Sequence, residues 1–300
     1  MSYGKSVRIF LPDATAVGIR HAEIVNRTGQ TVACPRNRLE ELKQWPETAK
    51  PGVYILFEAR LGDSKPMAYI GESENVADRL LMHDRKKDFW NDVVILTNKD
   101  DNLTKSHVKY LESKLEAMAK TADRYKLENG NTPTASSLPR AEREAMNELL
   151  DDMRIVLGTL GYPILEPLIP AKPSQNASVS AQVVAAEDNE ELTFTVHQLK
   201  ARGVQTDEGF VLKKGSTASK TTTASLNGKL LKMREQLLED KRMVDQGDHL
   251  LLTKDLLMSS STYAAALIAG TARSGPQSWY TASGVTLKSL EEGMAGPTEG

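Results

Sequence analysis

Cysteine is almost absent from this chain, because Cys34 is the single one among 300 residues. A disulfide within the chain is therefore excluded, and we expect a reducing, cytoplasmic location. Long hydrophobic runs are also lacking. The N-terminus shows no basic segment followed by an apolar run, and the apolar stretch 263–269 is too short to span a bilayer. We therefore expect neither a signal peptide nor a membrane partner.

Aromatic residues and excess positive charge are scarce as well. Aromatics make up 5% of the chain, so no extended platform for stacking bases is evident. The net charge of -2 excludes a protein that coats nucleic acid through a general excess of Lys and Arg. Any nucleic-acid contact must come from local basic patches, for which solvated surface charge is an equally good explanation. The candidate residues are Arg20, Arg27, Arg36, Arg38, Arg85, Lys86 and Lys87.

The apolar residues that are present suffice for more than one core. A hydrophobic content of 40% in 300 residues predicts two domains. The stretch that follows residue 168 is rich in Pro, Ser, Ala, Gln and acidic residues, which is typical of a linker. We predict an α+β protein with N-terminal strands and a helix at 1–50, packed on a module with a helical extension at 51–168. A linker at 169–191, a second small α+β domain at 192–292 and a disordered tail at 293–300 follow.

The secondary structure is predicted from runs and periodicity. Short strands are expected at 7–11 and 23–26 and a short helix at 39–45. Residues 53–57 and 67–70 are predicted to pair as antiparallel strands, with a third, buried strand at 93–96. Helices are expected at 75–87, 103–122 and 140–160. The C-terminal domain should contain strands at 192–196 and 209–212, helices at 228–246 and 260–269, and a hairpin at 279–287.

Five side chains of the central module have the chemistry that phosphodiester hydrolysis needs. Pairing of the two strands would bring Tyr54 and Tyr69 together, and a spacing of four places Arg79 and His83 on one helix face. Arg79 is suited to hold phosphate oxygens in a bidentate manner. Glu112, beside the apolar stripe of a later helix, offers a hard oxygen ligand for Mg²⁺ or Mn²⁺. Taken singly, each of these residues is more often an ordinary strand or surface residue.

Roles can be assigned if the side chains converge. Tyr54 could act as general base if nearby positive charge lowers its pKa, and His83 could relay that proton or orient the water. Tyr69 could hydrogen-bond the attacking water or the phosphate. No zinc-type Cys/His spacing and no serine-hydrolase elbow is present in the sequence.

The strings Gly52-Val53-Tyr54 and Tyr69-Ile70-Gly71, followed in order by Arg79, His83 and Glu112, resemble the GIY-YIG nuclease family. The resemblance covers roughly residues 50–130, with Val53 where the first string of the family has Ile. It implies a small three-stranded antiparallel sheet flanked by helices. It also implies a catalytic set and a single divalent cation on Glu112. That set is Tyr54, Tyr69, Arg79, His83, Glu112 and Asn129, with Asn131 as the alternative to Asn129.

Contacts to nucleic acid are expected next to this set. Gly71 would allow the backbone to turn tightly into the following helix and to approach the substrate. Arg85, Lys86 and Lys87 would contact phosphates. The resemblance therefore implies an endonuclease that cleaves DNA by water attack, with RNA left open as a substrate. A DNA-binding or adaptor protein that keeps the module without catalysis is the alternative from another class.

The C-terminal half resembles a domain of unknown function that often follows GIY-YIG modules. The matching stretches include Glu208-Gly209-Phe210-Val211, Gly215-Ser216 and Ser278-Trp279-Tyr280. Exposed Trp279 and Tyr280 near Arg273 could stack on bases, although a Trp packed in the core of the small domain is the more common situation. This domain is expected to position substrate or to bind a protein partner.

Overall fold

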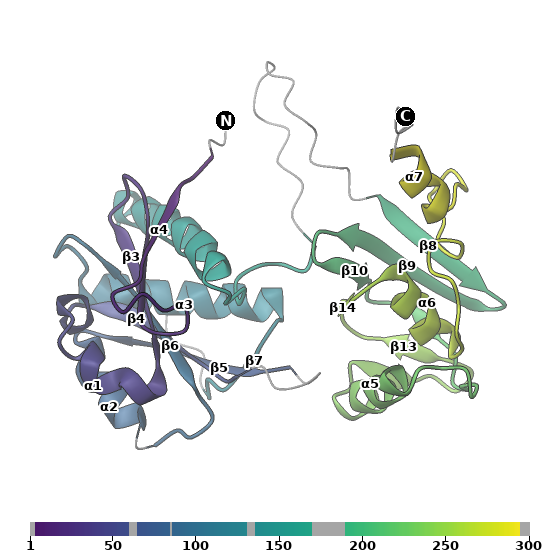
Figure 1. Cartoon of the computed structure of the whole chain (residues 1–300), viewed down its shortest axis with the longest axis horizontal. Coiled ribbons are helices and arrows are strands. Elements are labelled where there is room, and N and C mark those ends of the chain that lie inside the picture. Colours follow the sequence, from purple (N-terminus) through teal and green to yellow (C-terminus); the bar gives the residue numbers. More distant parts are fainter. Residues whose placement is uncertain (1–3, 60–64, 85, 131–135, 170–189, 295–300) are drawn as a thin grey trace, which may run out of the picture. The chain divides into compact units, whose positions relative to one another are not determined.

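The structure is a computed structural model that describes residues 4–59, 65–84, 86–130, 136–169 and 190–294 (Figure 1). The chain divides into two compact units, Met1–Pro167 and Leu168–Gly300. The predicted segments 1–50 and 51–168 therefore share one unit, and the mixed α+β class is confirmed. Residues 170–189 of the predicted linker and 295–300 of the predicted tail lie outside the described residues. No helix in the described part of the chain is both long and apolar enough to cross a membrane.

The first unit is built around a mixed sheet with the strand order β1-β2-β3-β6-β4-β5-β7. All neighbouring strands are antiparallel except β5 and β7, which are parallel. The strands are β1 (Val7–Phe10), β2 (Arg20–Ile24), β3 (Gly29–Pro35), β4 (Gly52–Phe57), β5 (Met67–Ser73), β6 (Asp92–Asn98) and β7 (Lys126–Leu127). The helices are α1 (Leu39–Leu42), α2 (Val76–Asp84), α3 (Lys105–Ala122) and α4 (Arg140–Thr159), with 3-10 turns η1 (Arg36–Arg38) and η2 (Pro46–Ala49).

Alternation along β4 explains why this sheet has two apolar faces. Val53, Ile55 and Phe57 join the core that α3 and α4 cover. Tyr54 and Leu56 join the core that α1 and α2 cover, because successive side chains point to opposite faces of a strand. The α1–α2 pair and the α3–α4 pair therefore lie on opposite sides of the sheet (Figure 1). A central strand buried on both faces accounts for its uninterrupted apolar sequence.

A sheet of only three strands is a wrong prediction for this unit. The three expected strands are present and pair antiparallel in the order β6-β4-β5. However, β3 pairs along its whole length with β6 and continues the sheet through β2 and β1. Residues 29–35 were not predicted as a strand, since small residues and a terminal Pro dominate them. The N-terminal segment therefore extends the sheet and does not merely pack on it.

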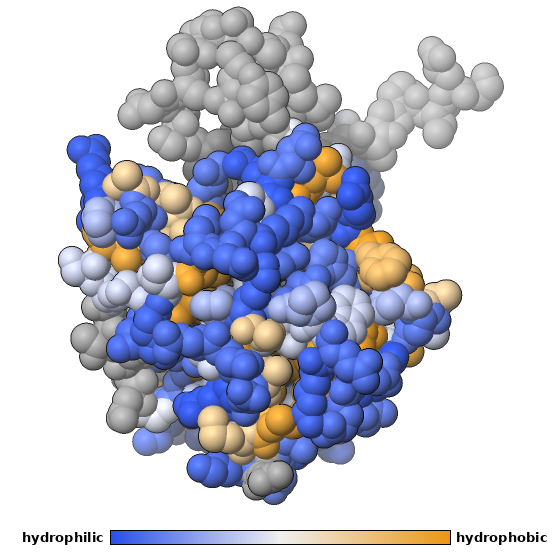
Figure 2. Space-filling model, turned by 90° about the vertical axis from the view of Figure 1, so that its left-hand side faces the viewer, coloured by the Kyte–Doolittle hydropathy of each residue, from blue (hydrophilic) through white to orange (hydrophobic). Residues whose placement is uncertain are grey.

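The hydropathy of one face of the first unit is shown in Figure 2. Hydrophilic residues predominate on this face, and the hydrophobic ones lie in small separate groups. Such scattered apolar residues are normal for a protein surface, so this face gives no sign of a large apolar docking site.

The second unit contains two sheets, in the strand orders β14-β10-β9-β8 and β11-β13-β12. Its strands are β8 (Glu191–Val196), β9 (Leu199–Thr206), β10 (Gly209–Leu212), β11 (Thr217–Ala218), β12 (Met243–Asp245), β13 (Leu250–Leu252) and β14 (Leu256–Met258). Its helices are α5 (Gly228–Glu239), α6 (Ser261–Ala269) and α7 (Leu287–Met294). Leu192, Phe194 and Phe210 pack with α6 residues and Trp279 in one core.

Three expectations for this unit are corrected. The predicted helix 228–246 ends at Glu239, because Lys241 has a left-handed φ of 57° and Met243 is buried in strand β12. The hairpin predicted at 279–287 is reduced to isolated bridges that Tyr280 makes with Thr193 and Thr286. Residues 293 and 294, assigned to the tail, belong to α7.

Candidate functional site

Four predicted site residues meet on the α2 face of the sheet. In the β4–β5 pair Tyr54 lies opposite Gly71, and Leu56 lies opposite Tyr69, so both tyrosines point to the same side. Their ring centroids are 6.3 Å apart. The His83 ring lies 5.6 Å from that of Tyr54 and 5.2 Å from that of Tyr69. The predicted convergence of the two tyrosines with the helix that carries His83, α2, is therefore present.

Hydrogen bonds join the residues of this group. The Tyr54 hydroxyl oxygen and His83 Nε2 are 2.8 Å apart. Arg79, one turn before His83 on α2, also hydrogen-bonds the Tyr54 hydroxyl, and this bond raises the pKa of Arg79. Arg79 is exposed whereas His83 is buried, so the group combines a solvent-facing cation with a buried imidazole. Because Arg79 is exposed, the N–H groups that do not contact Tyr54 can reach a phosphate.

Gly71 does not make the predicted turn, and it provides space for the Tyr54 ring. It lies inside β5 and its φ is not positive, so it makes no tight turn into the helix. A Cβ added to Gly71 would lie 2.4 Å from the Tyr54 hydroxyl and 2.5 Å from the adjacent ring carbon of Tyr54. Because Gly71 has no side chain, the Tyr54 ring can lie over the β5 backbone. In this position the Tyr54 hydroxyl reaches α2.

The pKa of Tyr54 shifts in the direction opposite to the one that the base hypothesis requires. Burial raises it strongly, and the hydrogen bond from Arg79 lowers it by less. Tyr54 is therefore a neutral phenol at pH 7. His83 is also neutral, because burial and then the charges of Arg79 and Lys87 lower its pKa to about 4. The Nδ1 atom of His83 is buried without a hydrogen-bond partner in the described part of the chain.

Glu112 approaches the group from the other face of the sheet. It lies on α3, which packs on the face that holds Ile70, whereas Tyr54 and Tyr69 lie on the α2 face. Its carboxylate still acts on the group, since its charge raises the pKa of Tyr54. The pKa of Glu112 itself is raised to about 7 by burial and then by the charges of Glu72 and Glu116. The predicted site therefore straddles β5, at the part of this strand that lies beyond its short pairing with β7.

Glu72 is a site residue that the sequence analysis missed. It follows Gly71 on β5, and its charge raises the pKa of both Arg79 and Glu112. Its backbone N–H hydrogen-bonds the Glu112 carboxylate, and its own carboxylate lies 2.8 Å from Lys105 Nζ. Its position directly after Tyr69-Ile70-Gly71 was the available signal in the sequence. Side chains alternate along β5, so Glu72 shares the α3 face with Ile70, but this requires that the strand continue past Gly71.

Asn129 is held by the backbone of β5. Its side-chain oxygen accepts from the Ile70 N–H at 3.1 Å, and its side-chain nitrogen donates to the Ile70 carbonyl at 2.7 Å. The amide thereby continues the parallel pairing of β7 with β5 past Leu127. Both polar groups of Asn129 are occupied in this way, so it positions the strand between Tyr69 and Gly71 and does not face the tyrosine hydroxyls. Asn131 lies outside the described residues.

The residues predicted to contact phosphates have different environments. Lys86 is exposed. Lys87 lies 2.6 Å from Glu128 and 4.2 Å from the centroid of the Tyr69 ring, so it is engaged in the site itself. Arg85 lies outside the described side chains. Of the N-terminal arginines, Arg36 and Arg38 form ion pairs with Asp84 and Asp13 respectively.

A divalent cation would find the Glu112 carboxylate here, with the charges of Glu72 and Glu116 near enough to raise its pKa. In the described residues no group of three or more His, Cys, Asp or Glu side chains is arranged to hold a metal ion. Glu112 nevertheless has the chemistry of a ligand for a hard cation, because it is an oxygen donor whose negative charge is penalised by burial and by acidic neighbours. One carboxylate with water and substrate phosphate oxygens is a common Mg²⁺ arrangement. The residues present therefore fit the predicted ion.

In the second unit, the two candidate stacking residues have different environments. Trp279 is fully buried, with its ring centroid 4.5 Å from Phe210 and 5.3 Å from Phe194. Its indole N–H donates to the Ser261 carbonyl at 3.0 Å. Trp279 is therefore a core residue that cannot stack on a base. Tyr280, next in the chain, is 40% exposed.

Comparison with known proteins finds a family match for one part of the chain. Residues 192–291 match the family described as a domain of unknown function, DUF4357. The match begins one residue inside β8 and ends within α7, so it covers the second unit and none of the residues around Tyr54. No curated protein and no solved structure matches the chain. The expected C-terminal domain of unknown function is confirmed by this match.

Proposed function

We propose that the protein is a divalent-cation-dependent endonuclease that hydrolyses phosphodiester bonds in DNA. The observation that carries this proposal is the 2.8 Å contact between Tyr54 and His83 beneath the exposed Arg79, with Glu112 reaching the same strand edge from α3. A phenol, an imidazole, a guanidinium and a carboxylate at one edge supply proton transfer, phosphate binding and a cation ligand. The order of these residues along the chain, which resembles that of the GIY-YIG nucleases, supports the same reaction.

The raised pKa of Tyr54 decides how a proton would move. A neutral phenol cannot simply remove a proton from water, so Tyr54 would accept it only as its own proton passes to His83 Nε2. His83 is available as an acceptor above about pH 4, and in the tautomer with the proton on Nδ1 its Nε2 can accept the proton of the Tyr54 hydroxyl. The negative charge of a phosphate at Arg79 would raise the basicity of His83 and so complete the transfer.

The remaining residues would hold the substrate. Arg79 would bind non-bridging oxygens of the scissile phosphate, with its guanidinium fixed against Tyr54. Tyr69, beside both Tyr54 and Lys87, would orient the water or the phosphate. Glu112 would hold a Mg²⁺ or Mn²⁺ ion, which when bound supplies Lewis-acid stabilisation of phosphate charge.

The proposal is tested with the purified full chain, Mg²⁺ and labelled single-stranded, duplex and branched DNA, with an RNA of the same sequence alongside. We expect cleavage that EDTA abolishes, and at least a 100-fold lower rate for Glu112→Gln. The matched control is Glu144→Gln, which neutralises an exposed carboxylate on α4 and should cleave like the parent. Binding of these substrates without cleavage in Mg²⁺ or Mn²⁺ would refute the nuclease and favour a DNA-binding protein. Equal rates for Glu112→Gln and the parent would refute the ligand assignment.

A further inference from the structure

The second unit has a sheet face on which polar side chains gather. Along β8 and the first half of β9 buried residues alternate with exposed ones. Leu192 and Phe194 enter the α6 core, whereas Thr193 and Thr195 are exposed. On β9, Ala201 is buried and its neighbours Lys200 and Arg202 are exposed. Because side chains alternate between the two faces of a strand, the exposed residues share the face opposite to α6.

The strand register aligns these residues into rows. Arg202 pairs with Thr193, and Thr193 forms a bridge with Tyr280, exchanging backbone hydrogen bonds of 2.7 and 2.9 Å with it. On the other side, the Lys213 N–H donates to the Arg202 carbonyl. Tyr280, Thr193, Arg202 and Lys213 therefore form one row that crosses the sheet, roughly 14 Å long at three strand spacings. Thr195 and Lys200 pair directly and form the next row.

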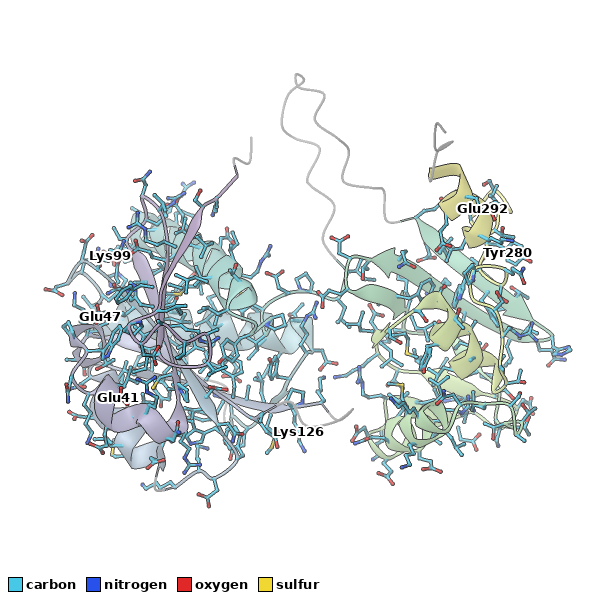
Figure 3. All side chains as sticks on the ribbon, in the orientation of Figure 1. Glu41, Glu47, Lys99, Lys126, Tyr280 and Glu292 are labelled. Carbon is cyan, nitrogen blue, oxygen red and sulfur yellow. The ribbon has the colours of Figure 1, made fainter. Side chains whose placement is uncertain are left out.

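This set of residues, Thr193, Thr195, Lys200, Arg202, Lys213 and Tyr280, is called the hairpin face below. It combines three cations, two hydroxyls and one aromatic residue, Tyr280, which is 40% exposed. Tyr280 is labelled in Figure 3. Glu191 is the one carboxylate that pairs with it in the described part of the chain, at 2.7 Å from Lys213 and 3.5 Å from Arg202. The face is therefore net positive, although the whole chain has a net charge of -2.

We propose that the hairpin face binds single-stranded nucleic acid, with a base stacked on Tyr280 and backbone phosphates on Lys200, Arg202 and Lys213. An aromatic ring next to cations on an exposed part of a sheet suits unpaired bases, because every base offers a π face to an aromatic side chain. A duplex keeps its bases stacked inside, so it would gain only the charge contacts. That the bound strand is the substrate of the first unit rests on the proposed function; the binding itself does not.

The test measures fluorescence anisotropy of a labelled single-stranded DNA with the full chain in EDTA, where no cleavage occurs. Tyr280→Thr should weaken binding roughly 5- to 100-fold, as expected for loss of one stacked base, while Tyr280→Phe should bind like the parent. Thr retains strand propensity at this position. The double variant Lys200→Gln/Arg202→Gln should lower the slope of log Kd against log salt by about 1.4, since each single-strand phosphate contact contributes about 0.7.

Two further variants sharpen the test. Glu191→Gln removes the carboxylate that competes for Arg202 and Lys213, so it should tighten binding several-fold. Lys229→Gln removes an exposed lysine on α5, away from the hairpin face, and should change nothing beyond a small general charge effect. Thermal unfolding of each variant verifies that the second unit stays folded.

The outcomes separate this inference from the nuclease proposal. Parent-like binding by folded Tyr280→Thr, or an equal loss with Lys229→Gln, would overturn the inference even if the protein cleaves DNA. Equal effects of Tyr280→Thr on single-stranded and duplex DNA would also overturn it, since stacking predicts an effect on the single strand. Conversely, a hairpin face that binds as described in a protein that cleaves nothing would refute the nuclease alone.

Discussion

The raised pKa of Glu112 predicts that the first unit loses stability as the pH rises. In the folded protein this pKa is about 7, against an ordinary value of 4.5. Between these two values the folded state retains a proton that the unfolded state has lost, so the free energy of unfolding falls with increasing pH. Below pH 4.5 the carboxyl is protonated in both states and has no such effect. Above pH 7 the full penalty of the buried carboxylate is present.

The size of the effect follows from the two values. Their difference corresponds to about 3 kcal/mol, at about 1.4 kcal/mol per pKa unit. Because Glu112 is only partly buried, solvent screening reduces this to about 1–2 kcal/mol. Glu112→Gln should therefore stabilise the first unit by about 1–2 kcal/mol at pH 8 and by close to zero at pH 4. Gln keeps an oxygen that can accept from the Glu72 N–H, so the substitution removes charge without removing that bond.

Urea denaturation measures this difference at pH 4, 6 and 8. Trp45 and Trp90 lie in the first unit and Trp279 in the second, so Trp279→Phe in both proteins makes tryptophan fluorescence report the first unit. Addition of Mg²⁺ at pH 8 should stabilise the parent and leave Glu112→Gln unchanged, because a cation that binds only the folded carboxylate acts by mass action. A stability difference that does not depend on pH would refute the reasoning. So would an equal pH response of Glu144→Gln.

Three other predictions concern β5 and the residues on the α2 face. Gly71→Ala should displace the Tyr54 ring and lower the free energy of unfolding by about 1–3 kcal/mol, measured by thermal or urea denaturation. The cleavage rate should fall by more than this loss of folded protein explains. Tyr54→Phe and His83→Gln should each reduce kcat strongly. If the two residues transfer one proton together, kcat of the double variant should be no lower than that of the slower single variant. Additive losses in kcat would contradict this proton transfer. Asn129→Leu should leave the Ile70 backbone groups unsatisfied and destabilise the first unit by about 2 kcal/mol, detected as faster hydrogen exchange in β5.

The features that depend on neighbours in the sequence could be predicted. Tyr54 and Tyr69 meet because β4 and β5 form a local antiparallel pair, and His83 follows Arg79 by one helical turn. The pKa of Tyr54 could not be obtained in this way. Its burial depends on β6 and on α2, and the sequence pattern of β4 alone does not reveal how completely they cover the ring. Proximity was therefore predictable, whereas the protonation of the phenol required the packing.

Non-local pairing explains the other differences. The extension of the sheet through β3 depends on contacts between residues about 60 positions apart, and a stretch with small residues and Pro35 has little strand signal of its own. The length of α5 was overestimated because the apolar spacing of a helix and that of a short strand coincide over a few residues, and Met243 continued both patterns. Trp279 could be assigned to the core or to the surface only once its contacts with Phe194 and Phe210 were known.

The edge of β5 explains why its site residues lie where they do. An edge strand exposes alternate backbone groups that need partners. Here β7 pairs with the first part of β5, and the Glu128 N–H donates to the Ala68 carbonyl. The Asn129 side-chain amide bonds both the N–H and the carbonyl of Ile70. The Glu112 carboxylate accepts from the Glu72 N–H. Asn129 and Glu112 thus hydrogen-bond the outward-facing backbone groups of Ile70 and Glu72. Gly71, over which the Tyr54 ring lies, is between these two residues. Under the proposed function, a carboxylate that also accepts from the Glu72 N–H would tie cation binding to the register of Tyr69 and Gly71. For this reason Glu112→Gln isolates the charge, whereas Glu112→Ala would also remove the bond to the strand.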